Sequence, residues 1–107
     1  MSTALTPLNF LSGIEALDYL QEDWRLDNAP HGAPARTFRS RVVFERPFAE
    51  TPLVHLGIVG LDASGDDATR ITARTENVSR EGFDLVLATW LHSRLWKVDV
   101  SWLALGP

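Results

Sequence analysis

Apolar and polar side chains alternate with a period of two residues through most of the chain after Arg36. In the segment 38–45, Phe38 and Phe44 share one face, and arginine and glutamate side chains occupy the other. In the segment 95–105, polar residues alternate with an apolar set made of Trp96, Val98, Val100, Trp102 and Ala104. Because successive side chains of a strand point to opposite faces, this pattern predicts strands with one buried face.

Turn-forming clusters interrupt the pattern at intervals of roughly ten residues, a spacing typical of all-β sandwiches. A further strand is expected at Ser12–Asp18, although apolar residues near helical spacing leave a short helix over 14–24 as the alternative. The sequence therefore predicts an all-β fold, a six-stranded antiparallel β-sandwich. The remaining strands are expected at 38–44, 53–61, 69–78, 83–91 and 95–105.

Two predicted strands, 53–61 and 83–91, carry apolar side chains on both faces. On the second of them Val86, Ala88 and Trp90 share the face that would point away from the core. A chain of 107 residues has no further layer to cover such a face. We therefore expect these strands to meet neighbouring subunits.

The composition is that of a single globular domain spanning residues 1–107, with 45% hydrophobic and 22% charged residues. This composition excludes disordered, collagen-like and coiled-coil proteins. The net charge of −4 repels phosphate backbones and anionic membrane surfaces, so no nucleic acid partner and no membrane insertion are expected.

The N-terminal segment shows no secretory signal, and no apolar run is long enough to span a membrane. The chain has no cysteine, so disulfides give no information about the compartment. We expect a soluble protein, cytoplasmic at synthesis or released by an unconventional route.

Enzymatic chemistry finds little support in the pattern. His31, His55 and His92 are far apart and lack metal-binding spacing. No nucleophile-elbow motif is present, and nothing in the pattern calls for two carboxylates facing each other across a cleft. The chain is therefore expected not to be an enzyme and to need neither a metal nor a cofactor.

An ordered set of short motifs resembles the pattern of the H-type lectin domain family. The resemblance covers residues 36–106, and residues 1–35 match it weakly. The motifs that carry it are Val42–Phe44, Pro47–Phe48, Thr51–Val54, Gly60–Asp62, Arg70, Val78, Gly82–Phe83, Thr89–Trp90 and Val100–Ala104.

The resemblance implies a trimer, with a hexamer as the alternative, that binds N-acetylgalactosamine or related galactose-type glycans between adjacent subunits. It also implies a carbohydrate site. The family's sugar-contacting positions correspond here to Arg70, Trp90, Leu91 and Trp96, and its acidic position, on the loop before the second strand, falls near Ala33.

Two of these positions depart from the family pattern. Ala33 has no carboxylate, although Asp27 could replace it if the loop follows another path, and His31 could add a hydrogen bond. Leu91 cannot bond an acetamido group through its side chain. Arg70 follows the acidic turn Asp66–Asp67, so a solvated surface ion pair is the alternative to ligand contact.

Two functions from different classes follow. The first is non-catalytic recognition of a glycan, which would suit an agglutinin or cell-adhesion role. The second is a structural, assembly or adhesion module that has the lectin fold but no working sugar site, which the departures at Ala33 and Leu91 favour.

Overall fold

The segments with a period of two form six strands in the computed structural model, which describes residues 7–65 and 67–107. A strand covers 9–18, so the helical alternative over 14–24 is wrong and the predicted antiparallel β-sandwich is confirmed. In the described part of the chain, no helix is long and apolar enough to cross a membrane. The strands are β1 (Asn9–Asp18), β2 (Arg36–Val43), β3 (Leu53–Ser64), β4 (Thr72–Glu76), β5 (Gly82–Thr89) and β6 (Arg94–Gly106).

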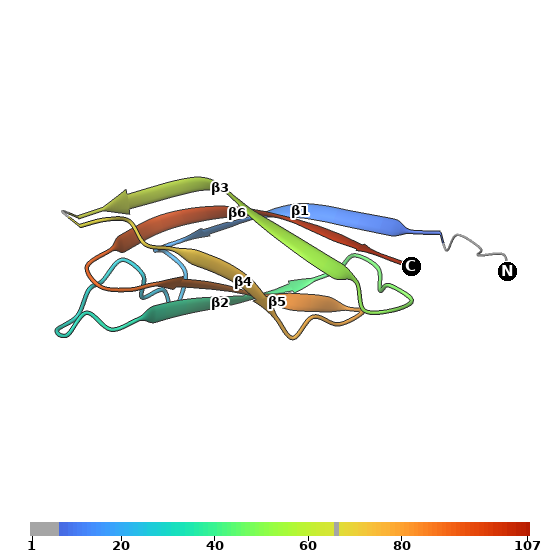
Figure 1. Ribbon diagram of the computed structural model, residues 1–107, viewed down its shortest axis with the longest axis horizontal. Coiled ribbons are helices and arrows are strands. Elements are labelled where there is room, and N and C mark those ends of the chain that lie inside the picture. Colours follow the sequence, from blue (N-terminus) through green and yellow to red (C-terminus); the bar gives the residue numbers. More distant parts are fainter. Residues whose placement is uncertain (1–6, 66) are drawn as a thin grey trace, which may run out of the picture.

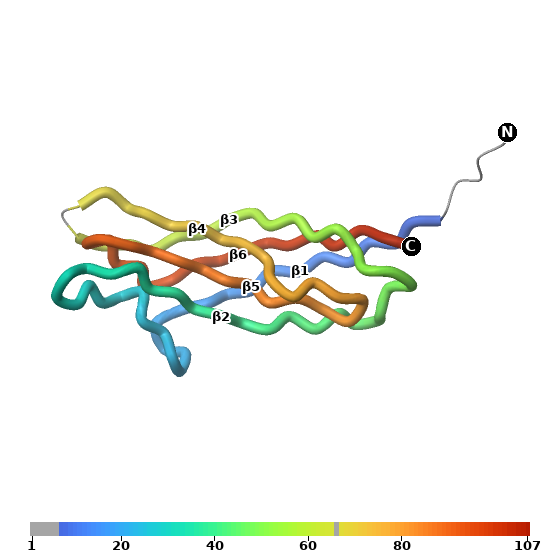
Figure 2. Tube along the Cα trace, turned by 60° about the horizontal axis from the view of Figure 1, so that its bottom comes forward, coloured from blue at the N-terminus to red at the C-terminus, as the bar shows by residue number. Residues whose placement is uncertain are grey.

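Two three-stranded sheets form the two layers of the sandwich (Figure 1). We call the first, in the order β1-β6-β3, the β6 sheet, and the second, in the order β2-β5-β4, the β5 sheet. All neighbouring strands are antiparallel. Figure 2 shows the edge strands β3 and β4 running side by side along one flank of the molecule. The central strands β5 and β6 therefore carry most of the buried surface.

The core lies between the inward faces of the two central strands. Phe83, Leu85 and Leu87 of β5 are fully buried, as are Val98 and Val100 of β6. Burying a side chain of this size contributes about 1.5 to 3 kcal/mol relative to leaving it exposed. The alternation read from the sequence thus selects which face of each central strand is inside.

An aromatic cluster lies in the core and reaches the C-terminal end of β6, where a Cβ on Gly106 would be 3.5 Å from the ring of Phe48. Phe44 lies 5.2 Å from Phe48, 5.8 Å from Phe83 and 5.7 Å from Trp102 between ring centroids. The indole of Trp102 fits because Gly13 lies opposite it on β1: a Cβ on Gly13 would be 2.8 Å from the ring. A side chain at position 13 would therefore displace the indole of Trp102, one of the two tryptophans of the core.

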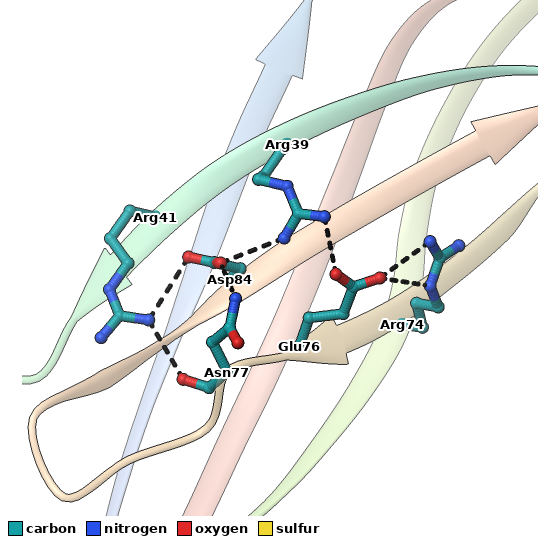
Figure 3. A network of polar contacts seen from close by, with 6 residues as sticks. All are labelled: Arg39, Arg41, Arg74, Glu76, Asn77 and Asp84. Carbon is teal, nitrogen blue, oxygen red and sulfur yellow. Dashed lines mark hydrogen bonds and ion pairs between the residues drawn. The ribbon is translucent and has the colours of Figure 1, made fainter.

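The outer face of the β5 sheet is covered by charged side chains from its three strands (Figure 3). Arg39 of β2 lies 2.6 Å from Glu76 of β4 and 3.0 Å from Asp84 of β5. Arg74 adds a second contact to Glu76 at 2.8 Å, and Arg41 lies 3.3 Å from Asp84. These pairs join the three strands across the sheet.

Val86 lies beneath this network and is only 1% exposed in the single chain. In the register of the sheet its neighbours are Arg39 on β2 and Arg74 on β4. The aliphatic stems of arginines can cover an apolar neighbour while their charged ends reach water. Val86 is therefore covered within the single chain, and the expectation that strand 83–91 meets a neighbouring subunit stays a prediction.

The outer face of the β6 sheet is different, because large apolar side chains stay exposed on it. Phe10, Leu105 and Leu53 form one row across its three strands, and Leu103 and Ile14 lie further along the same face. Phe10 is 68% and Leu53 is 71% exposed. We call these five residues the β6-sheet apolar face. The strand 53–61 was predicted to carry apolar side chains on both faces, and the exposed Leu53, its first residue, is one such side chain on the outer face.

The charged network makes stability depend on pH. A hydrogen bond from Asn77 and contacts with Arg41 and Arg39 lower the pKa of Asp84, and Arg39 followed by Arg74 lowers the pKa of Glu76. A carboxyl whose pKa is lower in the folded than in the unfolded state stabilises the fold above its unfolded pKa, about 4, and loses that contribution as the pH falls through the folded pKa.

We therefore expect the free energy of unfolding, measured with urea, to decline as the pH falls below about 4. The double variant Glu76→Gln/Asp84→Asn should show a shallower decline than the unmodified chain. Glu50→Gln, at an exposed position outside the network, is the control and should leave the profile unchanged. Parallel profiles for the double variant and the unmodified chain would contradict the assignment.

Candidate functional site

Three connections meet at the end of the sandwich opposite the C-terminus (Figure 1). They are the β1–β2 loop (19–35), the described part of the β3–β4 loop (65 and 67–71) and the β5–β6 turn (90–93). These connections hold five of the residues that the sequence proposed for the site, and the sixth, Trp96, is the third residue of β6. The five are Asp27, His31, Arg70, Trp90 and Leu91.

Arg36 ties two of these connections together. Its guanidinium donates to the carbonyl oxygens of Pro34 at 2.7 Å, Leu91 at 2.9 Å and Ser93 at 2.5 Å. The residue is 7% exposed, and burial, with a smaller effect of Arg94, lowers the pKa of Arg36 from its usual value. An arginine still stays charged, so this cation is stabilised by carbonyl dipoles. Its Nε has no hydrogen-bond partner.

Two buried hydroxyls attach the backbone of Arg70 to the same turn. The amide of Arg70 donates to Ser93 Oγ at 2.9 Å, and Thr89 Oγ1 donates to the carbonyl of Arg70 at 2.5 Å. Thr89, Ser93 and Arg36 are not among the site residues predicted from the sequence. The sequence did hold a signal for Arg36, because strand alternation places this charged residue on the same inward face of β2 as Phe38.

Arg70 and Trp90 lie next to each other along the backbone at the loop end of the β5 sheet. The last pair of β4 and β5 is Thr72 with Ala88, and Arg70 and Trp90 each lie two residues beyond it. Thr89, the residue before Trp90, is buried and donates through Oγ1 to the carbonyl of Arg70. Both residues are half-buried, and we call this part of the loop end the Arg70–Trp90 corner.

Arg70 also makes the ion pair that the sequence suggested as the alternative to ligand contact. Its Nη1 lies 2.7 Å from Asp67 Oδ2 and donates to the carbonyl of Ala68 at 3.1 Å. The hydrogen bond from Arg70, followed by one from the amide of Ala68, lowers the pKa of Asp67. His92 Nδ1 lies 3.8 Å from the same carboxylate oxygen. A partly exposed pair of this kind is screened by solvent and adds little to stability.

Trp96 does not follow the alternation expected for its strand. Ala63 pairs with Leu95 and Asp62 pairs with Lys97, so a β-bulge leaves Trp96 without a partner on β3. Leu95 takes the inward position and is fully buried. The expectation that Trp96 shares a face with Val98 is therefore wrong, because the bulge adds one residue to β6.

The indole of Trp96 instead packs at the end of the β6 sheet. It donates to Ser64 Oγ at 2.7 Å and meets Tyr19 edge to face, with ring centroids 5.6 Å apart. These contacts lie on the β6 sheet, whereas Arg70 and Trp90 lie at the end of the β5 sheet. In the single chain, Trp96 therefore lies in one layer of the sandwich, and Arg70 and Trp90 lie at the end of the other.

The two positions that depart from the family pattern both have left-handed backbone. Ala33 has a φ of 43° and is buried, and its amide donates to the carbonyl of Pro30 at 2.8 Å. Leu91 has a φ of 55°, and its exposed side chain is apolar. Neither side chain supplies a polar group to the site.

The β1–β2 loop places the remaining two candidates around an open groove of about 500 Å³. Asp27, with Trp24 and Pro34, lines this groove, and His31 is exposed on the same loop. The loop is held against β6 because Trp24 Nε1 donates to the carbonyl of Leu95 at 3.0 Å. Among the described residues, no three His, Asp or Glu side chains are grouped to hold a metal ion.

Residues 39–105 match the family model described as the H-type lectin domain. The chain belongs to the H-type lectin domain family. This H-type lectin domain is 35% identical over 75 residues to a protein of Fuscovulum blasticum described as ATP synthase subunits region ORF 7. It is 30% identical over 74 residues to Discoidin-2 of Dictyostelium discoideum. The matches cover 70% and 68% of this chain, but 65% and 29% of those relatives.

The lectin fold is supported by two solved structures of discoidin II from Dictyostelium discoideum. They superpose with TM-scores of 0.81 and 0.82 at 24% and 23% identity. The superpositions cover 98% and 99% of this H-type lectin domain and 39% of each discoidin II chain. By family, the domain is therefore of a carbohydrate-binding and non-catalytic kind.

The clamp formed by Arg36 leads to a prediction about stability. Arg36→Met keeps a long side chain but leaves three carbonyl oxygens without their donor. We expect a loss of about 2 kcal/mol or more in the free energy of unfolding, because a buried acceptor left unpaired costs about 1 to 3 kcal/mol. Arg25→Met, at an exposed position of the adjacent loop, is the matched control. Equal urea midpoints for the two variants would argue against a clamp.

Proposed function

We propose that this domain binds a neutral galactose-type glycan, such as one ending in N-acetylgalactosamine, at the corner formed by Arg70 and Trp90. The observation that supports the proposal is the hydrogen bond from Thr89, the residue before Trp90, to the carbonyl of Arg70, which joins the two segments at the loop end of a lectin sandwich. Asp27, His31, Leu91 and Trp96, at the same end, complete the proposed site. The binding is non-catalytic and needs no cofactor.

The chemistry of the corner suits a pyranose. A guanidinium donates in fixed directions to two acceptors at once and can therefore hold two neighbouring hydroxyl oxygens. An indole face can pack against the apolar C–H face of the ring. Because Thr89 and Ser93 hold the backbone of Arg70, less conformational freedom is lost when the sugar binds.

We further propose that the domain associates as a homotrimer, with a hexamer as the alternative, through the β6-sheet apolar face. The exposed Phe10 and Leu53 support this, because contiguous apolar surface on a folded domain marks a binding surface. Several equivalent sites in one particle would raise weak single-site affinity for a multivalent glycan by a factor of about 10² to 10⁴.

The sugar site is tested by titration with methyl galactoside and N-acetylgalactosamine, together with a glycan array. Arg70→Ala and Trp90→Ala should each weaken binding about tenfold or more, because each removes a charge-assisted or stacking contact. Arg46→Ala, an exposed arginine on the β2–β3 loop, is the control and should bind normally. Unchanged binding by Arg70→Ala would remove this residue from the site.

The assembly is tested by light scattering coupled to size exclusion. Leu103→Asp and Leu105→Asp should yield the 11.9-kDa chain as a monomer, because a buried unpaired carboxylate is costly. Thr37→Asp, on the outer face of the β5 sheet, should keep the size of the parent particle. If the parent chain is itself a monomer, the proposed assembly is wrong.

The second candidate is a structural, assembly or adhesion module without a working sugar site. The buried Ala33 and the apolar Leu91 favour it, since neither offers a polar group to a ligand. An oligomer that binds no glycan on the array would support this function over the first.

A further inference from the structure

We propose that Asp67 is a ligand-contacting residue, which supplies the hydroxyl-accepting carboxylate of the sugar site from the same chain as Arg70. It would make the site selective for neutral vicinal diols over acidic sugars. This inference rests on the proposed function, because it names a further residue and the ligand class of the same site.

The carboxylate of Asp67 is placed and oriented before any ligand arrives. Oδ2 lies 2.7 Å from Nη1 of Arg70, and Oδ1 accepts a hydrogen bond from the amide of Ala68 at 2.8 Å. An ionised carboxylate has about four acceptor sites on its two oxygens. With these two contacts made and its side chain 36% exposed, Asp67 retains acceptor capacity that faces solvent.

The exposed side of Asp67 faces an open cavity of about 530 Å³. Gly65, Asp67, His92 and Arg94 line it, so it lies between the β3–β4 loop and the β5–β6 turn. These two connections are joined through Arg70, whose backbone is bound to Ser93 and Thr89. A ligand in this cavity would therefore meet a fixed carboxylate with Arg70 directly beside it.

A carboxylate next to a guanidinium fits two neighbouring hydroxyl groups. One hydroxyl donates its proton to the carboxylate, and the oxygen of the next accepts a hydrogen bond from the guanidinium. The buried Ala33 offers no acceptor for this purpose. The negative charge of Asp67 would also oppose the carboxylate of a uronic acid, which Arg70 and Arg94 would otherwise attract, and so would shift the preference of the site towards neutral sugars.

The test compares methyl galactoside, its 3-deoxy and 4-deoxy analogues, and methyl galacturonate by titration calorimetry. The unmodified chain should bind methyl galactoside best. Asp67→Ala should weaken methyl galactoside binding about tenfold or more and should abolish the discrimination against at least one deoxy analogue. Asp67→Asn should lower the ratio of galactoside to galacturonate affinity. Glu45→Gln, at an exposed position after β2, is the matched control.

The possible results distinguish a failure of the proposed role of Asp67 from a failure of the proposed function. If the unmodified chain binds methyl galactoside but Asp67→Ala binds all four probes as the unmodified chain does, the role of Asp67 is wrong and the proposed function stands. If Asp67→Ala binds every probe more weakly by the same factor, Asp67 only orients Arg70, and direct contact is wrong. If the unmodified chain binds no galactose-type sugar, the proposed function itself fails.

Discussion

The burial of the inward faces of β5 and β6 against each other is the constraint on which the rest of the molecule depends. Side chains of a strand alternate, so fixing Leu87 inside also fixes Thr89 inside and Trp90 outside. A slip of one residue in β5 would exchange the two faces and remove Trp90 from the corner it shares with Arg70. The proposed site is therefore a consequence of the register of the core.

Buried polar groups extend this order from the core into the connecting loops. Arg36 holds the carbonyls of the β1–β2 loop and the β5–β6 turn, and Thr89 and Ser93 hold the backbone of Arg70. Buried polar groups need partners, so these contacts permit few loop arrangements. A rigid frame of this kind suits the recognition of a small sugar, whose few contacts leave little energy for ordering loops.

The two outer faces of the sandwich have different physical characters. The β5 sheet presents paired charges that cover Val86, whereas the β6 sheet presents exposed Phe10 and Leu53. The apolar residue on the outer face of the β5 sheet is covered within the single chain. The outer face of the β6 sheet leaves apolar side chains exposed, as surfaces that meet a partner do. Separating the two roles would leave the Arg70–Trp90 corner, at the end of the β5 sheet, open to a ligand when subunits associate.

The sequence by itself determined the six strands, the inward face of nearly every strand and the lectin family, because alternation and ordered motifs are local properties of the chain. Only the tertiary structure decided the position of Trp96, since a bulge depends on how β6 pairs with β3. It also decided that arginine stems cover Val86 and that Arg36 clamps two loops. These features depend on contacts between residues distant in sequence, which alternation along one strand does not encode.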